Sequence, residues 1–382
     1  MASGDINEIL IWSVSGGTLL VLLFVIIICC SFCKRQGPSY VLLPSERPIN
    51  TVRQPYYDSF RNFADYIINK DEIHVSKKLG EGSFGVVYVG VFRGSEVAVK
   101  TMLLPLCLDE GSQSFLNEVS TLSKLRNRYI VQFIGICLSV DNPCIIMEYM
   151  QGGSVADKIH KDFCSLEWKL IIKWSLDAAK GMEFLHAHKP QPIIHRDLKS
   201  DNLLVDENGV VKVGDFGTAK LYKKFTNSGS MFNRSKRRVQ DDQRSEFPGT
   251  VCWAAPEVLP PKPPGIRGKY TTAADVYSYG ITLWEMISNK RPFRGYKFEF
   301  QIMDAIISGT RPEIPSNCVP AMKELLNECW CKQIERRPTF EMIHRILDDW
   351  MTKIRLVEIA TPQTRATFPP SGSLKKETLP LR

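Results

Sequence analysis

Two carboxylates and one amide stand at fixed spacing in the middle of the chain. Asp197 and Asn202 fall within residues 195–202, HRDLKSDN, and Asp215 begins the triplet DFG thirteen positions after Asn202. Phosphoryl transfer asks for little covalent chemistry from a protein, but it needs groups that position the reactants and neutralise the moving phosphate. The two carboxylates and the amide have the types and spacing that this chemistry needs.

A glycine-rich segment precedes them. Residues 80–85, GEGSFG, contain G-x-G-x-x-G, a weak signal alone because dinucleotide-binding folds share it. A dinucleotide site needs a helix directly after the glycines, so that the helix N-terminus meets the pyrophosphate. Residues 86–92, VVYVGVF, favour a strand instead. The glycines therefore indicate a hairpin, and a third strand-like run, VAVK, ends at Lys100.

Together these motifs resemble those of protein kinases, in which a glycine-rich hairpin, a strand lysine, HRD and DFG occur in this order. The resemblance implies that ATP is the phosphate donor and that Asp197 receives the proton of the substrate hydroxyl. It implies that Asn202 and Asp215 hold Mg²⁺, with Mn²⁺ as an alternative. Lys100 would contact the α and β phosphates, and Glu118, eighteen residues further on, is its expected partner.

By the same resemblance, further residues surround ATP. Glu148 and Met150 belong to the hinge whose backbone binds adenine, and Met147 is the gatekeeper behind it. Val87 and Ala98 enclose the adenine ring. The residues expected to cover the phosphates are Gly80, Glu81, Gly82, Ser83, Phe84 and Gly85.

The resemblance also implies two structural devices. A regulatory spine would stack four residues on a base held by Asp275, although each of the four could also be an ordinary core residue. In addition, Glu257 would form a structural ion pair with Arg337. The expected spine residues are Leu122, Phe133, His195 and Phe216.

The acceptor preference is indicated by two residues. Lys199, two positions after Asp197, and Thr250 follow the pattern of serine/threonine kinases, whereas Cys329-Trp330 is closer to tyrosine kinases. The chain is therefore similar to the tyrosine-kinase-like branch of serine/threonine kinases, which implies protein substrates with Ser or Thr acceptors. The alternatives are a dual-specificity or tyrosine kinase, or a pseudokinase that acts as a membrane scaffold. The complete catalytic set argues against a pseudokinase.

The long, polar interval between Asp215 and Glu257 suggests control by phosphorylation. Arg196 could pair with a phosphate on this segment and so order it. A basic run at 233–238, NRSKRR, is either a solvated loop or a docking site for phosphate or anionic lipid. The candidate phosphate acceptors are Thr226, Ser228, Ser230, Ser235 and Ser245.

An uncharged apolar run near the N-terminus predicts one transmembrane helix. Residues 9–33 carry no charged side chain and, at 1.5 Å per residue, exceed the roughly 30 Å hydrocarbon core of a bilayer. A cleaved signal peptide and a buried helix are the alternatives, and two acidic residues before the run disfavour the signal peptide. Because Lys34 and Arg35 follow at once, residues 1–8 should lie outside and the kinase domain in the cytosol. The chain is expected to be a single-pass membrane protein.

Composition is consistent with this organisation. A chain of 382 residues with 44% hydrophobic content can bury a large core. The net charge of +8 comes from scattered basic residues, so nucleic-acid binding is not expected. Eleven cysteines do not indicate a disulfide framework in a large chain placed in a reducing compartment.

The order of predicted elements gives the fold class. Strands come first and helices later, which predicts an α+β, two-lobed protein-kinase fold with a small β-rich N-lobe and a larger helical C-lobe, preceded by one transmembrane helix. Residues 34–70 are expected to form a juxtamembrane linker, 71–352 the kinase domain and 353–382 a flexible tail. The expected strands are 73–79, 86–92, 97–99, 131–138 and 144–147, and the expected helices are 112–126, 166–188 and several beyond 277.

Overall fold

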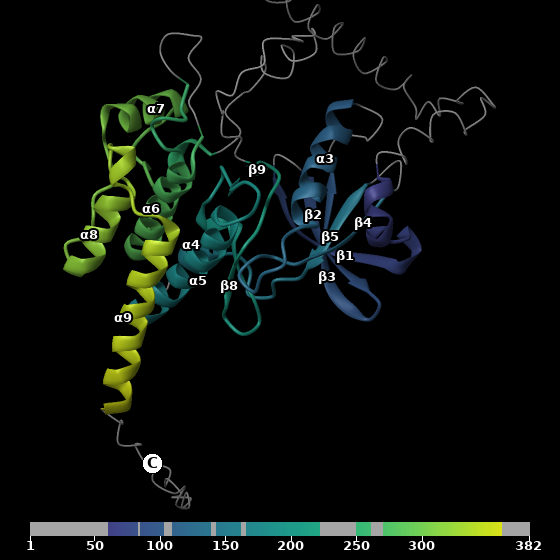
Figure 1. Cartoon of the computed structure of the whole chain (residues 1–382), viewed down its shortest axis with the longest axis horizontal. Helices are drawn as coiled ribbons and strands as arrows, with labels where there is room; N and C mark the ends of the chain where they lie inside the picture. The colour runs from purple at the N-terminus through teal and green to yellow at the C-terminus, as the bar shows by residue number, and fades with distance from the viewer. Residues whose placement is uncertain are drawn as a thin grey trace, which may run out of the picture. The chain divides into compact units, whose positions relative to one another are not determined.

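The computed structural model describes residues 60–82, 85–102, 109–138, 143–161, 166–221, 250–260 and 270–360 (Figure 1). The chain divides into two units after Asn62, and the account below concerns the second, Phe63–Arg382. The expected transmembrane helix at 9–33, the residues before it, most of the linker and the end of the tail lie outside the described residues. Within the described ranges, no helix is both long enough and apolar enough to cross a membrane.

The N-terminal lobe is a five-stranded antiparallel sheet in the order β1-β2-β3-β5-β4. The bounds of the strands are Ile73–Gly82, Gly85–Phe92, Ser95–Met102, Phe133–Cys137 and Cys144–Glu148 for β1 to β5. Two 3-10 helices, η1 (Arg61–Tyr66) and η2 (Lys70–Glu72), precede the sheet, and α3 (Asp109–Leu122) lies between β3 and β4. All five predicted strands and the meander of the first three are confirmed.

The C-terminal lobe is helical, as predicted, and Figure 1 shows its helices gathered apart from the sheet. Its helices are α4 (Val155–His160), α5 (Trp168–His186), α6 (Thr272–Ser288), α7 (Glu299–Ser308), α8 (Pro320–Cys329) and α9 (Phe340–Ala360). Short pairs β6 (Ile193–Ile194) with β9 (Lys220–Leu221) and β7 (Leu203–Val205) with β8 (Val211–Val213) carry the loops of the site. The 3-10 turns are η3 (Ser200–Asn202), η4 (Val251–Trp253) and η5 (Ile334–Arg336).

Helix α6 is the core of this lobe. Every residue from Ala274 to Met286 is buried, including the two carboxylates Asp275 and Glu285. Buried carboxylates are costly unless other groups bond to them, so each must have partners within the fold. Helix α6 therefore presents two fixed acceptors to the segments that pack on it.

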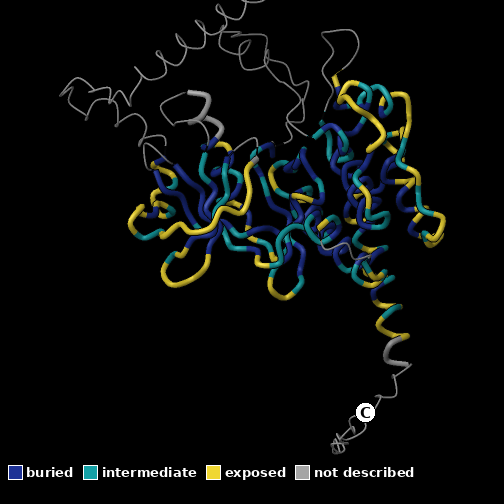
Figure 2. Tube along the Cα trace, turned by 180° about the vertical axis from the view of Figure 1, so that it is seen from behind, coloured by how far each residue is buried: buried dark blue, intermediate teal, exposed yellow. Residues whose placement is uncertain are grey.

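The C-terminal ends of α3 and α9 differ most from the prediction. Helix α3 ends at Leu122 rather than at residue 126, because the chain tightens there into turns in which Leu125 N–H donates to Leu122 O at 3.0 Å. Helix α9 continues to Ala360, so residues 353–360 of the expected flexible tail are helical, with Leu356 and Val357 exposed (Figure 2). Pro362, which disfavours helix at the residue before it, is the first proline after this helix.

The expected ion pair between Glu257 and Arg337 is confirmed. Arg337 Nη1 and Nη2 bind the two carboxylate oxygens of Glu257 at 2.6 and 3.0 Å, and Arg337 also donates to Cys331 O and Ala273 O, both at 2.9 Å. The Arg337 side chain is 0% exposed, so its charge must be matched by groups within the fold. The pair ties the segment after η4 to the turn before α9.

Arg337→Ala should therefore lower the free energy of unfolding by about 3–5 kcal/mol, the usual cost of leaving one partner of a buried pair unmatched. Urea unfolding of the full chain measures this change. Arg345→Ala is the matched control, because Arg345 forms an exposed i,i+4 pair with Glu341 and should cost about 0.5 kcal/mol or less. Equal effects for the two variants would contradict the structural role of Arg337.

Candidate active site

Lys100 on β3 contacts two carboxylates from distant segments. Its Nζ lies 2.8 Å from Glu118 Oε1 on α3 and 2.9 Å from Asp215 Oδ1 in the DFG triplet. The Lys100 and Glu118 side chains are only 8% and 2% exposed, whereas Asp215 is 36% exposed. The predicted Lys100–Glu118 pair is confirmed, and the contact with Asp215 was not predicted because no local spacing links residues so far apart.

The charges of these groups support one another. Burial alone would lower the pKa of Lys100, but the two carboxylates raise it above its ordinary value. Burial would raise the pKa of Asp215, yet the adjacent Lys100 holds it below its usual range. Lys100 is therefore a cation and Asp215 an anion throughout the neutral range. This places a positive and a negative group together beside β3, the central strand of the sheet.

Four of the predicted ATP residues share one face of the sheet. Val87 pairs with Lys100, and Ala98 pairs with Met147 in the antiparallel register. Residues directly opposite each other, and residues two apart on one strand, point to the same face. Val87, Ala98, Lys100 and Met147 therefore line one surface, as an adenine and phosphate site would require.

The glycine hairpin joins β1 to β2 through the pair Gly82 and Gly85. A Cβ on Gly85 would lie 2.0 Å from the carbonyl oxygen of Thr101, so this glycine is needed for strand packing. Glu81 is exposed and pairs with Lys78 at 2.6 Å. Ser83 and Phe84 lie outside the described residues, so their expected contacts with the phosphates stay a prediction. The expected phosphate contacts of Gly80 and Gly82 also stay a prediction.

The hinge is more constrained than the sequence suggests. The N–H of Glu148 donates to Gln132 O at 2.9 Å, and its carboxylate accepts from Gln132 N–H at 2.6 Å and from Lys212 Nζ at 2.6 Å. The Glu148 N–H is therefore not free for a ligand. In the described part of the chain the N–H of Met150 has no protein acceptor, which leaves it the better placed of the two to bind a base.

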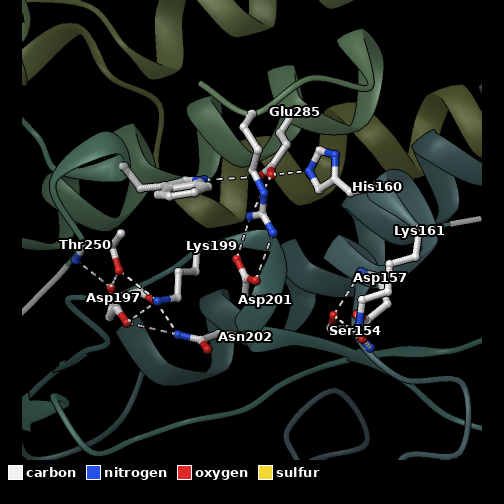
Figure 3. Close-up of polar contacts among 12 residues, drawn as sticks. Ser154, Asp157, His160, Lys161, Asp197, Lys199, Asp201, Asn202, Thr250 and Glu285 are labelled. Carbon is white, nitrogen blue, oxygen red and sulfur yellow. Dashed lines mark hydrogen bonds and ion pairs between the residues drawn. The ribbon is translucent and has the colours of Figure 1, made fainter. Parts of the chain in front are cut away.

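The predicted catalytic residue Asp197 lies at the centre of a second cluster (Figure 3). Its Oδ1 accepts from the N–H and the hydroxyl of Thr250, both at 2.9 Å, while its Oδ2 lies 3.2 Å from Lys199 Nζ and from Asn202 Nδ2. Lys199 Nζ also donates to the Thr250 hydroxyl at 2.7 Å. Asp197, Lys199 and Thr250 thus form a closed set of contacts across 53 residues of sequence.

Helix α6 anchors the loop that carries Asp197. The carboxylate of Asp275 accepts from the backbone N–H groups of His195 and Arg196, both at 2.9 Å. Arg196 has a φ of 69°, a left-handed conformation that non-glycine residues adopt only when their surroundings hold it. The predicted anchoring by Asp275 is confirmed.

The four residues of the predicted spine lie in the core, and two of them are in contact. Leu122, Phe133, His195 and Phe216 are all buried, and the rings of His195 and Phe216 lie 5.3 Å apart. His195 Nε2 is also 2.9 Å from Gly214 O. His195 and Phe216 of the predicted spine therefore pack against each other, and Asp275 binds the backbone of His195.

A sequence model of the family described as protein tyrosine and serine/threonine kinase matches residues 73–347, well over half of the chain. The chain belongs to the protein kinase family.

Curated relatives agree with this family. A probable serine/threonine-protein kinase, drkA of Dictyostelium discoideum, is 37% identical over 75% of this chain and 42% of its own length. The serine/threonine-protein kinase STY46 of Arabidopsis thaliana is 38% identical over 72% of this chain and 44% of its own length. A putative serine/threonine-protein kinase/receptor, R818 of Acanthamoeba polyphaga mimivirus, is 37% identical over 77% of this chain and 16% of its own length. This kinase spans less than half the length of these relatives.

Protein kinases generally use ATP and Mg²⁺, and the donor set of this kinase fits such a cation. The Asn202 Nδ2 donates to Asp197, which leaves Asn202 Oδ1 for a cation, and Asp215 is an ionised, partly exposed carboxylate. Hard oxygen donors of this kind suit Mg²⁺. Within the described residues no group of three or more His, Cys, Asp or Glu side chains is placed to hold a metal ion by itself.

Arg196 of this kinase contacts two other groups of the protein. Its Nε donates to Thr218 O, and its guanidinium carbon lies 5.3 Å from the ring centroid of Tyr270. The five candidate acceptors between 226 and 245, and the basic run at 233–238, lie outside the described residues. Control through Arg196 stays a prediction.

Proposed function

We propose that this chain is a serine/threonine protein kinase that transfers the γ-phosphate of ATP to Ser or Thr hydroxyls of protein substrates. The contact set of Asp197, Lys199 and Thr250 is the observation that carries the proposal. The Thr250 hydroxyl donates to the Asp197 carboxylate and accepts from Lys199 Nζ, so it holds these two side chains together. A short aliphatic hydroxyl can then approach both Asp197 and Lys199. The curated names of the relatives support the same acceptor class.

In this mechanism, side chains of the kinase position the reactants and remove the proton of the acceptor hydroxyl. Asp197 accepts the proton of the acceptor hydroxyl, and Lys199 beside it offers a cation to the transferring phosphate. Lys100 binds the α and β phosphates while Glu118 fixes its ammonium. Asn202 and Asp215 would hold Mg²⁺, which when bound neutralises charge on the phosphates.

One assay tests the proposal directly. The full-length chain is incubated with ATP and Mg²⁺ and a generic protein substrate, and the products are hydrolysed to phosphoamino acids. Phosphoserine and phosphothreonine are expected. Phosphotyrosine alone would reject the acceptor class, and no transfer above that of a heat-denatured sample would reject the activity.

Replacing Thr250 tests the contact set itself. Thr250→Val keeps the shape but removes the hydroxyl that bonds Asp197 and Lys199, so kcat should fall by about 10- to 100-fold, the equivalent of one hydrogen bond to a charged group. Thr250→Ser is the matched control, because it retains the hydroxyl and should keep most of the activity. Steady-state rates at saturating ATP measure both variants, and equal loss in the two would argue against this role.

The same proposal places the kinase at a membrane, anchored by residues 9–33 with the catalytic domain in the cytosol. The uncharged run followed by Lys34 and Arg35 supports it. Expression in cells followed by alkaline carbonate extraction tests it: the full chain should stay with the membrane and a chain lacking residues 9–33 should not. Protease treatment of sealed vesicles should then remove the kinase domain, and protection of that domain would reverse the orientation.

The proposal also includes control by phosphorylation of the segment between residues 222 and 249. Its support is Arg196, whose guanidinium lies beside the loop of Asp197 and would gain a phosphate as a partner. Phosphatase treatment of active kinase should lower its rate, and Arg196→Ala should make the rate insensitive to phosphatase. If phosphatase treatment left the rate of the wild-type kinase unchanged, the proposed control by phosphorylation would be contradicted.

A further inference from the structure

A cavity of about 630 Å³ lies between the turn that follows α3 and the end of α5 with the turn after it. Tyr66, the last residue of η1, completes its wall. No residue of the active site described above lines this cavity, so it is a separate feature of the kinase. Its charged and aromatic lining residues are Lys124, Arg126, His188, Lys189, Tyr66 and Phe184.

The wall of the cavity carries positive charge without a matching negative group. Lys124, Arg126 and Lys189 are cations at neutral pH, and no Asp or Glu is among the lining residues. Within the described ranges none of these three cations forms an ion pair, and Lys124 Nζ donates only to the hydroxyl of Ser120, at 3.3 Å. Like charges gathered around one cavity repel each other, and an anion bound among them would relieve that repulsion.

Two aromatic rings form the apolar part of the wall. The ring of Tyr66 packs against that of Phe133, with centroids 5.2 Å apart, so its position is fixed by the core. Phe184 lies in the last turn of α5, and both Tyr66 and Phe184 are partly exposed. Rings of this kind offer apolar contact to a ligand. The cavity therefore suits a molecule that joins an anionic group to an apolar one.

A phosphomonoester is the anion that these donors suit best. It carries close to two negative charges at neutral pH and has three strong acceptor oxygens. Arg126 supplies the planar fork that binds phosphate through paired hydrogen bonds, and Lys124 and Lys189 add compact point charges. His188 Nδ1 lies 3.1 Å from Gln191 O, which leaves Nε2 as the ring nitrogen for a ligand. All three cations are exposed, so a ligand can reach them from solvent.

We propose that this cavity is a second ligand site of the kinase, separate from the ATP site, which takes a phosphomonoester attached to an apolar body. Lys124, Arg126 and Lys189 hold the phosphate, and the apolar body lies against Tyr66 and Phe184. Soluble aromatic phosphates and the headgroups of phosphomonoester lipids share this chemistry. The site is independent of the proposed acceptor class and of the proposed membrane anchor, because neither uses a residue of the cavity.

The test is ligand-observed NMR on the full-length kinase in a neutral detergent, with the ATP site filled by a non-hydrolysable ATP analogue and Mg²⁺. Phenyl phosphate and a soluble short-chain phosphatidic acid are the two probes, and the tighter binder identifies the source of the phosphate. At least one should bind with a Kd of about 1 mM or tighter, the range expected of so small a ligand. Phenyl sulfate, which carries less charge on the same ring, should bind about fivefold more weakly than phenyl phosphate.

Variants of the cavity wall locate the bound probe. Arg126→Ala should weaken binding of the tighter probe about tenfold, because the paired donors are lost. Lys189→Ala, on the opposite turn, should weaken it about fivefold and serves if Arg126→Ala does not fold. Arg128→Ala is the matched control: Arg128 is also exposed, two positions further on, but it does not line the cavity and should bind the probe as wild type does. Thermal unfolding shows that each variant is folded.

Two outcomes would overturn the inference. Absence of binding by both probes at millimolar concentration would show that the cavity holds no phosphomonoester. Equal weakening by Arg126→Ala and Arg128→Ala would show diffuse attraction to a basic surface in place of a site. Neither outcome touches the kinase activity, which the phosphoamino acid assay measures separately.

Discussion

Asp197→Asn should lower kcat for protein phosphorylation by about a thousandfold while leaving the fold intact. An amide cannot accept the hydroxyl proton, and general base catalysis by a placed side chain contributes about 10²- to 10⁴-fold. The asparagine oxygen can still accept from Thr250 N–H, but its amide group would face Lys199 Nζ and Asn202 Nδ2, which lie 3.2 Å from Asp197 Oδ2. The variant thus loses both the base and one stabilising charge contact.

The measurement is steady-state phosphorylation at saturating ATP, with thermal unfolding of the same samples. Asp349→Asn is the matched control, because Asp349 forms an exposed helix pair with Lys353 and should leave the rate unchanged. A melting temperature close to wild type with lost activity would assign the effect to chemistry. Retained activity in Asp197→Asn would sink the catalytic role of this carboxylate.

Lys100→Met should abolish measurable activity and also lower the free energy of unfolding by about 3–5 kcal/mol. The loss of stability follows from burial: Glu118 is 2% exposed, and its Oε2 has no hydrogen-bond partner within the described structure, so Lys100 is its main counter-charge. Burial raises the pKa of Glu118 even with Lys100 nearby, so without the lysine its carboxyl would be driven further toward the neutral form. The loss of activity follows because Asp215 loses its cation at the same time.

A double variant separates the two effects. Lys100→Met with Glu118→Met replaces the buried pair by apolar side chains and should recover much of the stability without any activity. Urea unfolding and the kinase assay measure the two properties independently. Stability that stays low in the double variant would contradict the assignment of the cost to the unmatched Glu118.

Motif spacing was enough to predict contacts whose partners are carried by well-separated but recognisable motifs. Lys100 with Glu118, Asp275 with the catalytic loop, and Glu257 with Arg337 were all found as expected. The helix expected at 166–188 is found as α5, and its apolar residues Trp174, Ala178, Met182 and Leu185 are buried at helical spacing, whereas Leu170, in the first turn of the helix, is only partly buried. Local pattern was therefore a good guide to elements and a weaker one to their ends.

Contacts that depend on how separate loops meet could not be predicted. Nothing in the local sequence shows that the carbonyl oxygen of Gln132 accepts from the N–H of Glu148, or that Gly85 lies against Thr101. Arg291 donates to Asp201, although the two residues are 90 positions apart and belong to no shared motif. Such pairs arise from the pairing of strands and the packing of loops in the folded chain, and only the three-dimensional structure reveals them.

The continuous burial of helix α6 determines how the kinase should respond to heating. Asp275 and Glu285 stand ten residues apart on it, about 15 Å along the axis, and they hold the catalytic loop and the segment of Trp253 respectively. Amides in so continuously buried a helix exchange with solvent only when the whole lobe opens. The spacing between the base and the acceptor platform is therefore kept until cooperative unfolding, so heat should remove activity and structure in a single step.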